Sequence, residues 1–405
     1  MTTQNSTDWR LPPAVAFPVL ASVTVSFLAS ASAPTPLYPT YQAEWGFSPL
    51  AVTTIFGVYA IAVLVALLFF GRLSDHLGRK PVLLAAMFVQ VLTMGLFASA
   101  NGLGMLLLAR VVQGLAAGVA IAAVGAGLLD LDKSRGAIAN AITTPMGTAT
   151  GGILSGVFVT LLPAPQQLIF LVLGAVMVAQ GIGIAFMRET LVPRAGVLAS
   201  LKPRFAFSDA IRAPLLRAAP AIVATWAAAG VFASLSPAMV RSLTGIPSPL
   251  LSGLAMFAMA GSGGVAVYVL RHLQPRRSMR FGVISLAAGV LLLVPALSLG
   301  LLSLFYIALS LAGVGFGSGF QGAVRSVVSS AKAHERAGVL SVVFVLAYLA
   351  MGLPAIGAGW LLAHGRSLPS TTLEFAALVL VLSVVAVLPD GSTRRSPVQG
   401  ARITT

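Results

Sequence analysis

The stretch GRLSDHLGRK, residues 71–80, places a single carboxylate, Asp75, among three cationic side chains. It directly follows the uncharged run Leu50–Phe70, in a chain that contains only ten Asp and Glu residues. A carboxylate in such a loop can accept hydrogen bonds from the N-terminus of an adjacent helix or pair with an arginine. Gly71 would let a neighbouring helix approach closely, and Gly78 would permit a turn. The pattern predicts that this loop contacts a neighbouring helix.

A second charged residue stands where hydrocarbon is expected. Arg110 lies in the apolar segment LLLARVVQGLAAG, residues 106–118, about eight residues and hence roughly 12 Å from the nearer end of its helix. A charge at that depth costs about 2.5–3.5 kcal/mol even on a lenient scale, so a position facing the protein interior or water is expected. The alternative is that the side chain snorkels to the membrane surface.

The composition of the chain is that of a membrane protein. Hydrophobic residues make up 58% of it and charged residues 9%, against roughly 45–50% and 25% in soluble domains. Segments long enough to cross roughly 30 Å of hydrocarbon recur along the sequence. We expect twelve, at residues 14–33, 50–70, 81–100, 102–129, 137–162, 166–187, 215–238, 248–270, 281–300, 302–328, 337–363 and 370–388. Backbone hydrogen bonding in lipid requires these spans to be helices, so the predicted fold class is all-α and polytopic.

The net charge of +15 would suggest a nucleic-acid partner in a soluble protein, but the positions of the charges indicate a membrane surface instead. Arg110 lies within a span, and only Arg241 and Arg366 fall on one side, so the other Lys and Arg residues mark the second side as cytoplasmic. Both termini lie there, and the first span is expected to remain as an uncleaved helix. The chain has no cysteine, which excludes disulfides, thiolate metal sites and a cysteine nucleophile.

The longest polar connection, which begins at Arg188, divides the spans six and six. We expect an N-terminal six-helix bundle at residues 1–187, a cytoplasmic central loop at 188–214, a C-terminal six-helix bundle at 215–388 and a cytoplasmic tail at 389–405. Short matches between the halves indicate an internal repeat. When Gly114 is aligned with Gly313, Leu309 stands opposite Arg110, so only the first half carries this charge.

The pattern G-x-L-x-D-x-x-G-R-K between the second and third of twelve helices resembles the signature loop of the major facilitator superfamily, whose helices form two pseudo-symmetric six-helix bundles. The residues that match are Gly71, Arg72, Asp75, Gly78, Arg79 and Lys80. The resemblance implies that Asp75 stabilises the outward-open state by tying the halves together at the start of the eleventh helix, near Ala333–Gly338. The alternative is that Asp75 only solvates a basic loop. His76 stands where the family usually has a basic residue.

Two further segments resemble proton-coupled exporters of the same superfamily. In the fourth helix, Arg110, Gln113 and Gly114 match an R-x-x-Q-G motif. In the fifth helix, a glycine-rich stretch matches G-P-x-x-G-G, except that Thr148 replaces the proline. Its glycines are Gly147, Gly151, Gly152 and Gly156. Packing of small residues against a neighbouring helix is the alternative explanation for these glycines.

The resemblance implies a secondary transporter in the cell (inner) membrane, a drug or metabolite antiporter that exports compounds by alternating access. All ten acids and all four histidines fall in loops, in tails or at helix ends, so no midplane residue is available to carry the proton. Three alternatives follow: Asp75 exchanges the proton, Glu44 or Glu374 does so from the outside, or the protein is a uniporter. An importer and a non-transporting sensor with this fold also remain open.

No sequence feature indicates an enzyme, because HExxH, GxxxxGK[ST] and a helix-borne pair of Asp, Glu or His are all missing. We therefore expect no metal and no cofactor, an ion gradient (protons) as the energy source, and a monomer whose partners are the lipid bilayer and a small-molecule substrate.

A cavity without a carboxylate has no fixed anion for a cationic substrate, whereas Arg110 offers a positive charge to an anion or a neutral acceptor. The expected substrates are small amphipathic compounds that are neutral or weakly acidic. The candidate cavity residues are Ser22, Ser26, Ser30, Thr225, Trp226, Tyr306, Ser310 and Tyr348. For each of them, hydrogen bonding or packing between helices is the alternative role.

Overall fold

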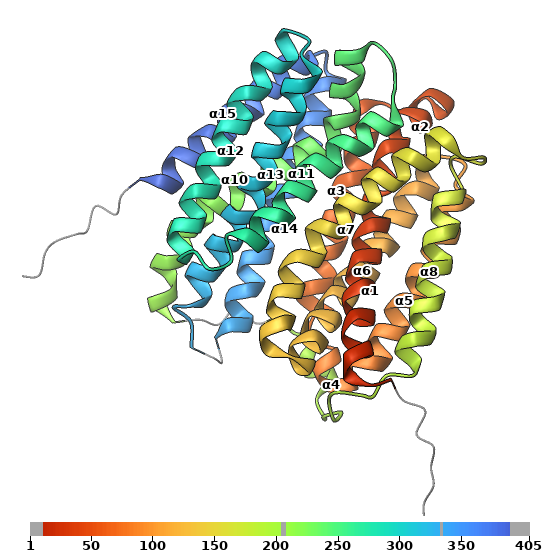
Figure 1. Ribbon diagram of the computed structural model, residues 1–405, viewed down its shortest axis with the longest axis vertical. Coiled ribbons are helices and arrows are strands. Elements are labelled where there is room, and N and C mark those ends of the chain that lie inside the picture. The colour runs from red at the N-terminus through yellow and green to blue at the C-terminus, as the bar shows by residue number, and fades with distance from the viewer. Residues whose placement is uncertain (1–10, 204–207, 333–334, 389–405) are drawn as a thin grey trace, which may run out of the picture.

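The computed structural model describes residues 11–203, 208–332 and 335–388, and within these ranges every regular element is a helix (Figure 1). The N-terminal half contains α1 (Pro13–Ser32), η1 (Thr35–Leu37), α2 (Tyr38–Trp45), α3 (Pro49–Phe70), α4 (Ser74–Leu77), α5 (Arg79–Ala98), α6 (Leu103–Leu131), α7 (Lys133–Leu161) and α8 (Leu168–Ala185). The connection contains α9 (Val197–Ser200), and the C-terminal half contains α10 (Asp209–Thr244), α11 (Pro249–Val269), α12 (Pro275–Ser298), α13 (Leu302–Val328), α14 (Arg336–Ala363) and α15 (Leu368–Val387). The predicted all-α fold class is confirmed. The predicted tail, 389–405, lies outside the described residues.

Two helical segments extend well beyond the spans that hydropathy predicted. The first continues from α1 through the η1 turn into α2, because Pro34 and Pro36 tighten the chain into a 3-10 turn without ending the helical path. α10 begins at Asp209 and ends where Gly245 adopts φ 75°, so it is longer at both ends than the predicted 215–238. Its first and last turns are polar and therefore gave no apolar pattern.

Each half has its own hydrophobic core. One cluster of buried side chains joins α1, α3, α5, α6 and α8, and two clusters fill the C-terminal half. Glycines allow equivalent close contacts in the two halves: Gly114 and Gly118 bring α6 onto α3, as Gly313 and Gly317 bring α13 onto α11. These paired contacts agree with the internal repeat that the sequence indicated.

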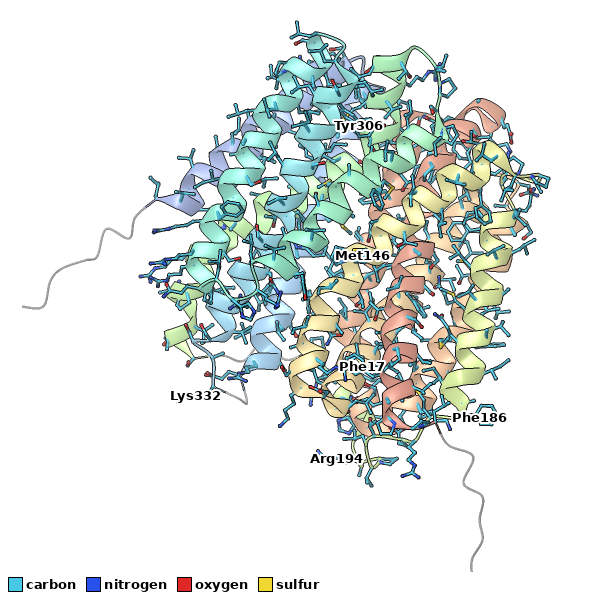
Figure 2. The ribbon with its side chains drawn as sticks, in the orientation of Figure 1. Phe17, Met146, Phe186, Arg194, Tyr306 and Lys332 are labelled. Atoms are coloured by element: carbon cyan, nitrogen blue, oxygen red, sulfur yellow. The ribbon has the colours of Figure 1, made fainter. Side chains whose placement is uncertain are left out.

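The two ends of the bundle differ in charge. Figure 2 shows Arg194 and Lys332 at the lower end of the view, and Arg366, between α14 and α15, lies at the other end. We call the lower end the basic end. The opposite end, where α3 and α11 begin and α7 and α14 end, is the outer end.

The two halves contact each other along two seams, α7 with α11 and α3 with α14. In the first, Gly156 lies against Pro249. In the second, Gly359 lies so close to Thr53 that a side chain at Gly359 would overlap the threonine hydroxyl. These contacts lie near the outer end, and Figure 1 shows the ribbons of the two halves separating toward the basic end. The halves therefore approach most closely at the outer end.

Eleven of the described helical segments are long and apolar enough to cross a membrane, with α1 through α2 counting as one. The other long helix, α7, has 29 residues, but its many Gly and Thr residues lower its hydropathy, and it packs against α1 and α11. Large apolar side chains such as Phe88, Leu171 and Val265 are exposed on the outside, as contact with lipid requires. The protein is a multi-pass membrane protein.

A bulky side chain placed in the α7–α11 seam can test whether this seam closes the outer end. In Gly253→Val the new side chain would overlap the Gly152 backbone, which costs about 1–3 kcal/mol and should shift the population toward separation at the outer end by about 5- to 150-fold. The readout is labelling of Thr53→Cys, buried in the other seam, by a polar maleimide. Because the chain has no cysteine, this thiol is the only one.

The matched control is Gly95→Val, since no atom lies within 4 Å of the position where the Gly95 side chain would begin. We expect the labelling rate to rise in Gly253→Val and not in Gly95→Val. Equal rates in the two variants would contradict the closure of the outer end by these seams.

Candidate functional site

Arg110 lies inside the N-terminal half, with 1% of its surface exposed. Gly114 and Gly118 follow it on α6 at one-turn intervals and hold this helix directly against α3, which fixes the position of the arginine. The alternative in which the side chain snorkels to the membrane surface is therefore excluded. An interior location is observed, as its depth in the sequence predicted.

The guanidinium group of Arg110 donates three hydrogen bonds. Nη1 donates to the Ala31 carbonyl and to Gln113 Oε1, each at 2.7 Å, and Nη2 donates to the Tyr38 hydroxyl at 2.6 Å. The side chain thus joins α6 to the bend between α1 and α2, and its Nε–H has no acceptor among the described residues.

One of the carbonyls beside this group is available because of a proline. Pro34 has no N–H to donate to the Ser30 carbonyl four residues earlier, and Gln113 Nε2 donates to that carbonyl instead, at 3.0 Å. The end of α1 also carries the negative pole of the helix dipole, which favours a cation. Arg110 and Gln113 therefore act together as a cap for the C-terminal end of α1.

Three aromatic rings complete the surroundings of Arg110. Its Cζ lies 5.3 Å from the ring centre of Tyr59, 5.7 Å from Phe97 and 6.0 Å from Tyr38. Arg110 has no ion-pair partner in the part of the chain that the structure describes. Its described partners are neutral carbonyl, amide and hydroxyl groups and aromatic rings, which stabilise the charge without neutralising it, so Arg110 still attracts an electron-rich group.

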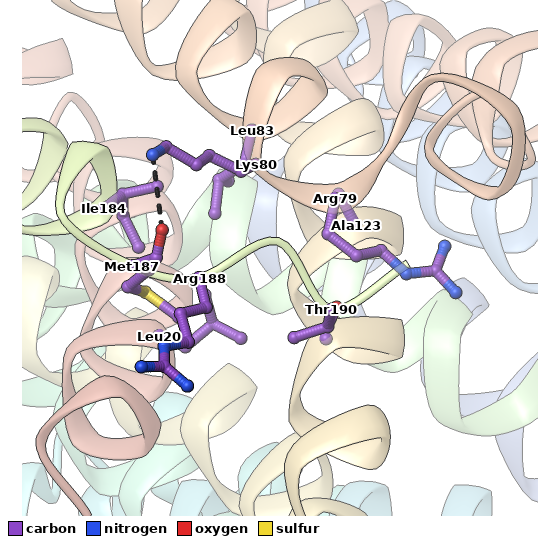
Figure 3. A pocket seen from close by; sticks show the side chains of 10 residues that line it. Leu20, Arg79, Lys80, Leu83, Ala123, Ile184, Met187, Arg188 and Thr190 are labelled. Atoms are coloured by element: carbon purple, nitrogen blue, oxygen red, sulfur yellow. Dashed lines mark hydrogen bonds between the residues drawn. The ribbon is translucent and has the colours of Figure 1, made fainter. Parts of the chain in front are cut away.

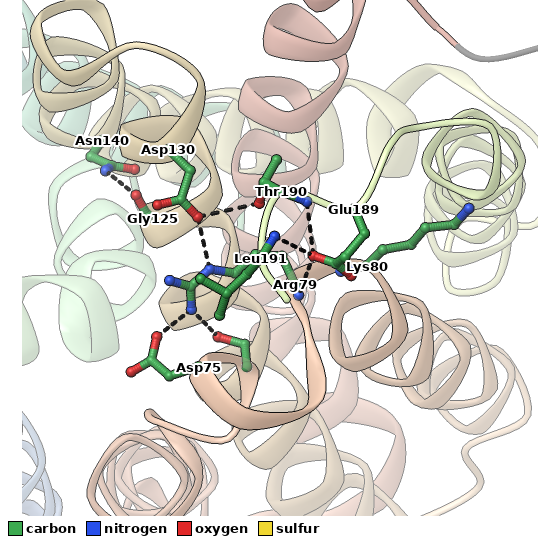
Figure 4. A network of polar contacts seen from close by, with 10 residues as sticks. Asp75, Arg79, Lys80, Gly125, Asp130, Asn140, Glu189, Thr190 and Leu191 are labelled. Carbon is green, nitrogen blue, oxygen red and sulfur yellow. Dashed lines mark hydrogen bonds and ion pairs between the residues drawn. The ribbon is translucent and has the colours of Figure 1, made fainter. Parts of the chain in front are cut away.

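At the basic end, Arg79, the first residue of α5, connects the loop of residues 71–78 to α6 (Figure 4). Its guanidinium pairs with Asp75, donates to Ser74 Oγ at 2.8 Å, and donates to Asp130 at the end of α6 at 3.0 Å. Thr190, after α8, donates to the same Asp130 oxygen at 3.2 Å. One arginine is therefore shared by two carboxylates from different helices.

Glu189 and Lys80 cap each other's helices. The Glu189 carboxylate accepts hydrogen bonds from the backbone N–H groups of Arg79 and Lys80 at 2.8 and 3.0 Å, at the start of α5. In return, Lys80 Nζ donates to the carbonyls of Ala185 and Met187 at the end of α8. Both contacts place opposite charges at helix poles, where they are favourable. They fix α5 to α8.

A narrow pocket lies beside this junction (Figure 3). It is lined by Leu20, Arg79, Lys80, Leu83, Ala123, Gly127, Ile184, Met187, Arg188 and Thr190. The sequence analysis did not single out Glu189 or Asp130. An acid next to the end of an apolar span is the pattern that could have indicated both, since loop acids can cap a neighbouring helix.

A family model described as the Major Facilitator Superfamily matches residues 20–395. The chain belongs to this superfamily. The match covers both halves and the signature loop, and it indicates a transporter rather than an enzyme. No curated protein gives a significant match to the chain.

Solved structures of other transporters share the fold. The crystal structure of the nucleoside transporter NupG (D323A mutant) has a TM-score of 0.69 at 12% identity and covers 93% of this chain and 99% of its own. A bacterial homologue of the human lysosomal transporter Spinster, in an inward-facing and occupied conformation, has a TM-score of 0.68 at 13% identity, with 92% and 96% covered. At these identities the likeness concerns the fold alone.

In this superfamily member the signature loop contacts its own half. Asp75, whose side chain is 47% exposed, pairs with Arg79 and makes no recorded polar contact with the start of α14 among the described residues. Residues 333–334 of the expected partner region lie outside that description. Glu335, next to them, accepts hydrogen bonds from the backbone N–H groups of Ser208 and Lys332. The latch between the halves stays a prediction for another conformation.

Other residues of the loop have different local roles. Gly78 has φ 99°, which favours glycine, and a side chain there would meet the Glu189 carboxylate. A side chain at Gly71 would first meet the backbone of Leu67, one turn earlier in the chain, so the local turn already favours glycine here. His76 contacts the Ala195 carbonyl through Nδ1 at 3.1 Å and holds the connection against the loop.

The four glycines of α7 serve two interfaces. Gly147 and Gly151 lie against the backbone of α1, and Gly152 and Gly156 lie against α11 of the other half. This arrangement agrees with the packing explanation. Thr148 occupies the place of the family's proline, and its hydroxyl donates to the carbonyl of Thr144 in the preceding turn.

The predicted cavity serines of α1 point into the N-terminal half. Gln180 of α8 donates to Ser22 Oγ at 3.0 Å and to Ser26 Oγ at 2.9 Å, and Gln90 of α5 donates to Ser30 Oγ at 2.8 Å. These bonds match the interhelical role that was the alternative to ligand contact. A cavity role for the three serines would require them to exchange these partners.

The candidates in the C-terminal half separate into two groups. Tyr306 Oη donates to the Leu251 carbonyl at 2.9 Å, the Ser310 carbonyl accepts from Ser262, and the buried Thr225 hydroxyl bonds to its own helix. Trp226 and Tyr348 are partly exposed, as are Tyr306 and Ser310, and their ring centres lie 5.0 Å apart. The pair differs from Tyr306 in its polar atoms, because Tyr306 Oη donates to a carbonyl whereas Trp226 Nε1 has no partner among the described residues.

The cap on α1 can be tested through Gln113. Gln113→Leu leaves the Ser30 carbonyl and one Arg110 hydrogen bond without a partner in a buried site, so we expect the free energy of unfolding to fall by about 1–3 kcal/mol. Thermal unfolding in detergent, compared with Gln167→Leu at an exposed position without a side-chain cap, measures this loss. Equal unfolding temperatures for the two variants would contradict a capping role.

Proposed function

We propose that this protein is a proton-coupled exporter of small amphipathic compounds that are neutral or weakly acidic. The observation that carries the proposal is the environment of Arg110, a buried cation that caps a helix and has no ion-pair partner among the described residues. Its R-x-x-Q-G setting resembles that of proton-coupled exporters. The proposal also assigns the basic end to the cytoplasm, in line with the positive-inside rule.

The charges support the proposed substrate class. Arg110 repels a cationic compound, and each described carboxylate lies in a loop or within about two turns of a helix end. A cation would therefore find no fixed counter-charge at membrane depth, whereas a neutral acceptor or a weak acid gains a hydrogen bond from an arginine. A nucleoside, the substrate class named for NupG, is neutral and amphipathic and belongs in a test panel.

Asp75 is our candidate for the coupling residue. Its carboxylate is half exposed at the basic end, so it can exchange protons with water there. A proton on Asp75 would remove its ion pair with Arg79, which keeps its bond to Asp130. The loop would then be free to change its contacts, so protonation and the position of the loop would be linked.

Facilitated transport without proton coupling is the second candidate. It is favoured by one observation: in the described ranges no carboxylate lies in the middle of a long helix, where burial would raise its proton affinity. The two candidates share the fold and the substrate class, and they differ in whether protons move with substrate.

The proposal predicts substrate-dependent proton movement in liposomes. Reconstituted protein under an imposed pH gradient should change the internal pH when a neutral amphipathic compound, a nucleoside or a weak organic acid is added. Asp75→Asn should abolish this change, because an amide cannot exchange the proton. Glu374→Gln, at the exposed outer end beside Arg366, is the matched control and should retain it.

The outcomes separate the candidates. Substrate flux without proton movement in the unchanged protein would overturn coupling and favour facilitated transport. Loss of proton movement in Glu374→Gln but not in Asp75→Asn would transfer the coupling role to the outer end. Transport of cationic compounds alone would contradict the role given to Arg110.

A further inference from the structure

Four aromatic side chains form a cluster in the C-terminal half: Trp226 of α10, Phe316 and Phe320 of α13, and Tyr348 of α14. The Trp226 ring centre lies 5.0 Å from Tyr348, 5.2 Å from Phe320 and 5.6 Å from Phe316. Phe316 and Phe320 are stacked with an angle of 10° between their planes. We call this set the aromatic cluster.

The aromatic cluster is not part of a closed core. All four side chains are partly exposed, whereas the helices that carry them have fully buried residues on their packed faces. Tyr348 also packs against the hydrophobic cluster of the N-terminal half, which includes Tyr59 beside Arg110. The rings therefore lie at the junction of the two halves, on the side of α14 that faces the arginine site.

The internal repeat shows that helix packing does not require a ring at position 316. In the alignment of Gly114 with Gly313, the N-terminal half has Ala117 where α13 has Phe316. The paired glycines make equivalent close contacts in both halves. The same packing is thus achieved with a methyl group in one half and a phenyl ring in the other, so the ring needs a different explanation.

One polar atom in the cluster lacks a partner. Trp226 Nε1 is buried and has no hydrogen-bond acceptor among the described residues. Buried indole N–H groups in proteins usually find an acceptor, because leaving one unpaired is unfavourable. An acceptor supplied from outside the chain, by a ligand or by water, would satisfy this donor.

We propose that the aromatic cluster is a binding site for a planar, uncharged ring that carries a hydrogen-bond acceptor at its edge. Ring faces and edges favour a flat aromatic group in offset or edge-to-face contact, and the Trp226 N–H selects an acceptor. No described carboxylate lies nearby to hold a cation, and the negative ring faces disfavour an anion. This inference rests on the proposed function only in that the protein takes a small-molecule substrate, and it narrows the class of that substrate.

Three neutral probes of similar size test the proposal: coumarin, which is planar and has a carbonyl acceptor; naphthalene, which is planar without one; and octahydrocoumarin, which keeps the carbonyl but is not planar. Binding is measured by equilibrium dialysis of the full chain in nanodiscs, with empty nanodiscs correcting for partition into lipid. The protein should bind coumarin more tightly than naphthalene, and octahydrocoumarin most weakly.

Two variants then separate the ring contacts from the hydrogen bond. Trp226→Phe keeps a ring but removes the N–H, so coumarin should bind about two- to tenfold more weakly, as expected for one hydrogen bond, while naphthalene binding stays unchanged. Phe316→Ala introduces the alanine that the other half has at this position and should weaken the binding of both coumarin and naphthalene. Trp360→Phe, 51% exposed at the outer end, is the control and should change neither.

If Trp226→Phe lowered the affinity for coumarin and for naphthalene equally, the proposed hydrogen bond from Nε1 to the ligand would be overturned. Water would then be the partner of Nε1. Equal binding of coumarin and octahydrocoumarin would overturn the planar-ring site. The proposed function fails separately: ring binding with no transport of any compound in liposomes would refute it, and transport that Trp226→Phe and Phe316→Ala leave unchanged would refute only this inference.

Discussion

The charge of Arg110 has to be balanced inside an apolar bundle, and the N-terminal half is arranged around that requirement. Pro34 leaves the Ser30 carbonyl without a helical donor and Gln113 bonds to it, while Arg110 bonds to the neighbouring Ala31 carbonyl. Three aromatic rings lie around the guanidinium. A carboxylate would have balanced the charge within one ion pair. Dipoles and rings stabilise the charge without neutralising it, so the guanidinium can still attract an electron-rich group.

The charged residues at the basic end have a structural role, which is to hold helix ends together. Glu189 and Lys80 bond to backbone groups at helix ends, and Arg79 joins two carboxylates from different helices, so the loop between α3 and α5 is held to its own half. The two halves meet instead through glycine seams near the outer end. Polar bonds thus hold the elements of the N-terminal half together at this end, whereas the contact between the halves consists of close backbone packing, which a rigid-body movement can open.

Hydropathy predicted the helices because length and apolar content are imposed by lipid, and the depth of Arg110 predicted its interior position for the same reason. Boundaries were less accurate where turns are polar, as at both ends of α10. The spacing of Ser22, Ser26 and Ser30 showed that they share a face, but not that this face meets α8 and α5, since one helix alone does not reveal its neighbours. The role of Glu189 depends on a helix end that is distant in sequence, which is why the sequence did not indicate it.

The two halves share a backbone plan but differ in what they present at their junction. The internal repeat places Arg110 opposite Leu309 and Ala117 opposite Phe316, so one half presents a buried cation and the other an aromatic surface. Packing alone would allow the same residues in both halves, because the glycine contacts are equivalent. Tyr348 lies between the two sites, since it belongs to the aromatic cluster and also packs on the hydrophobic cluster that includes Tyr59.

A compound with an electron-rich group at one end and a flat apolar ring at the other would contact both halves at once. Movement of one half relative to the other would then change the fit of such a compound, which is what an alternating-access cycle requires of its substrate.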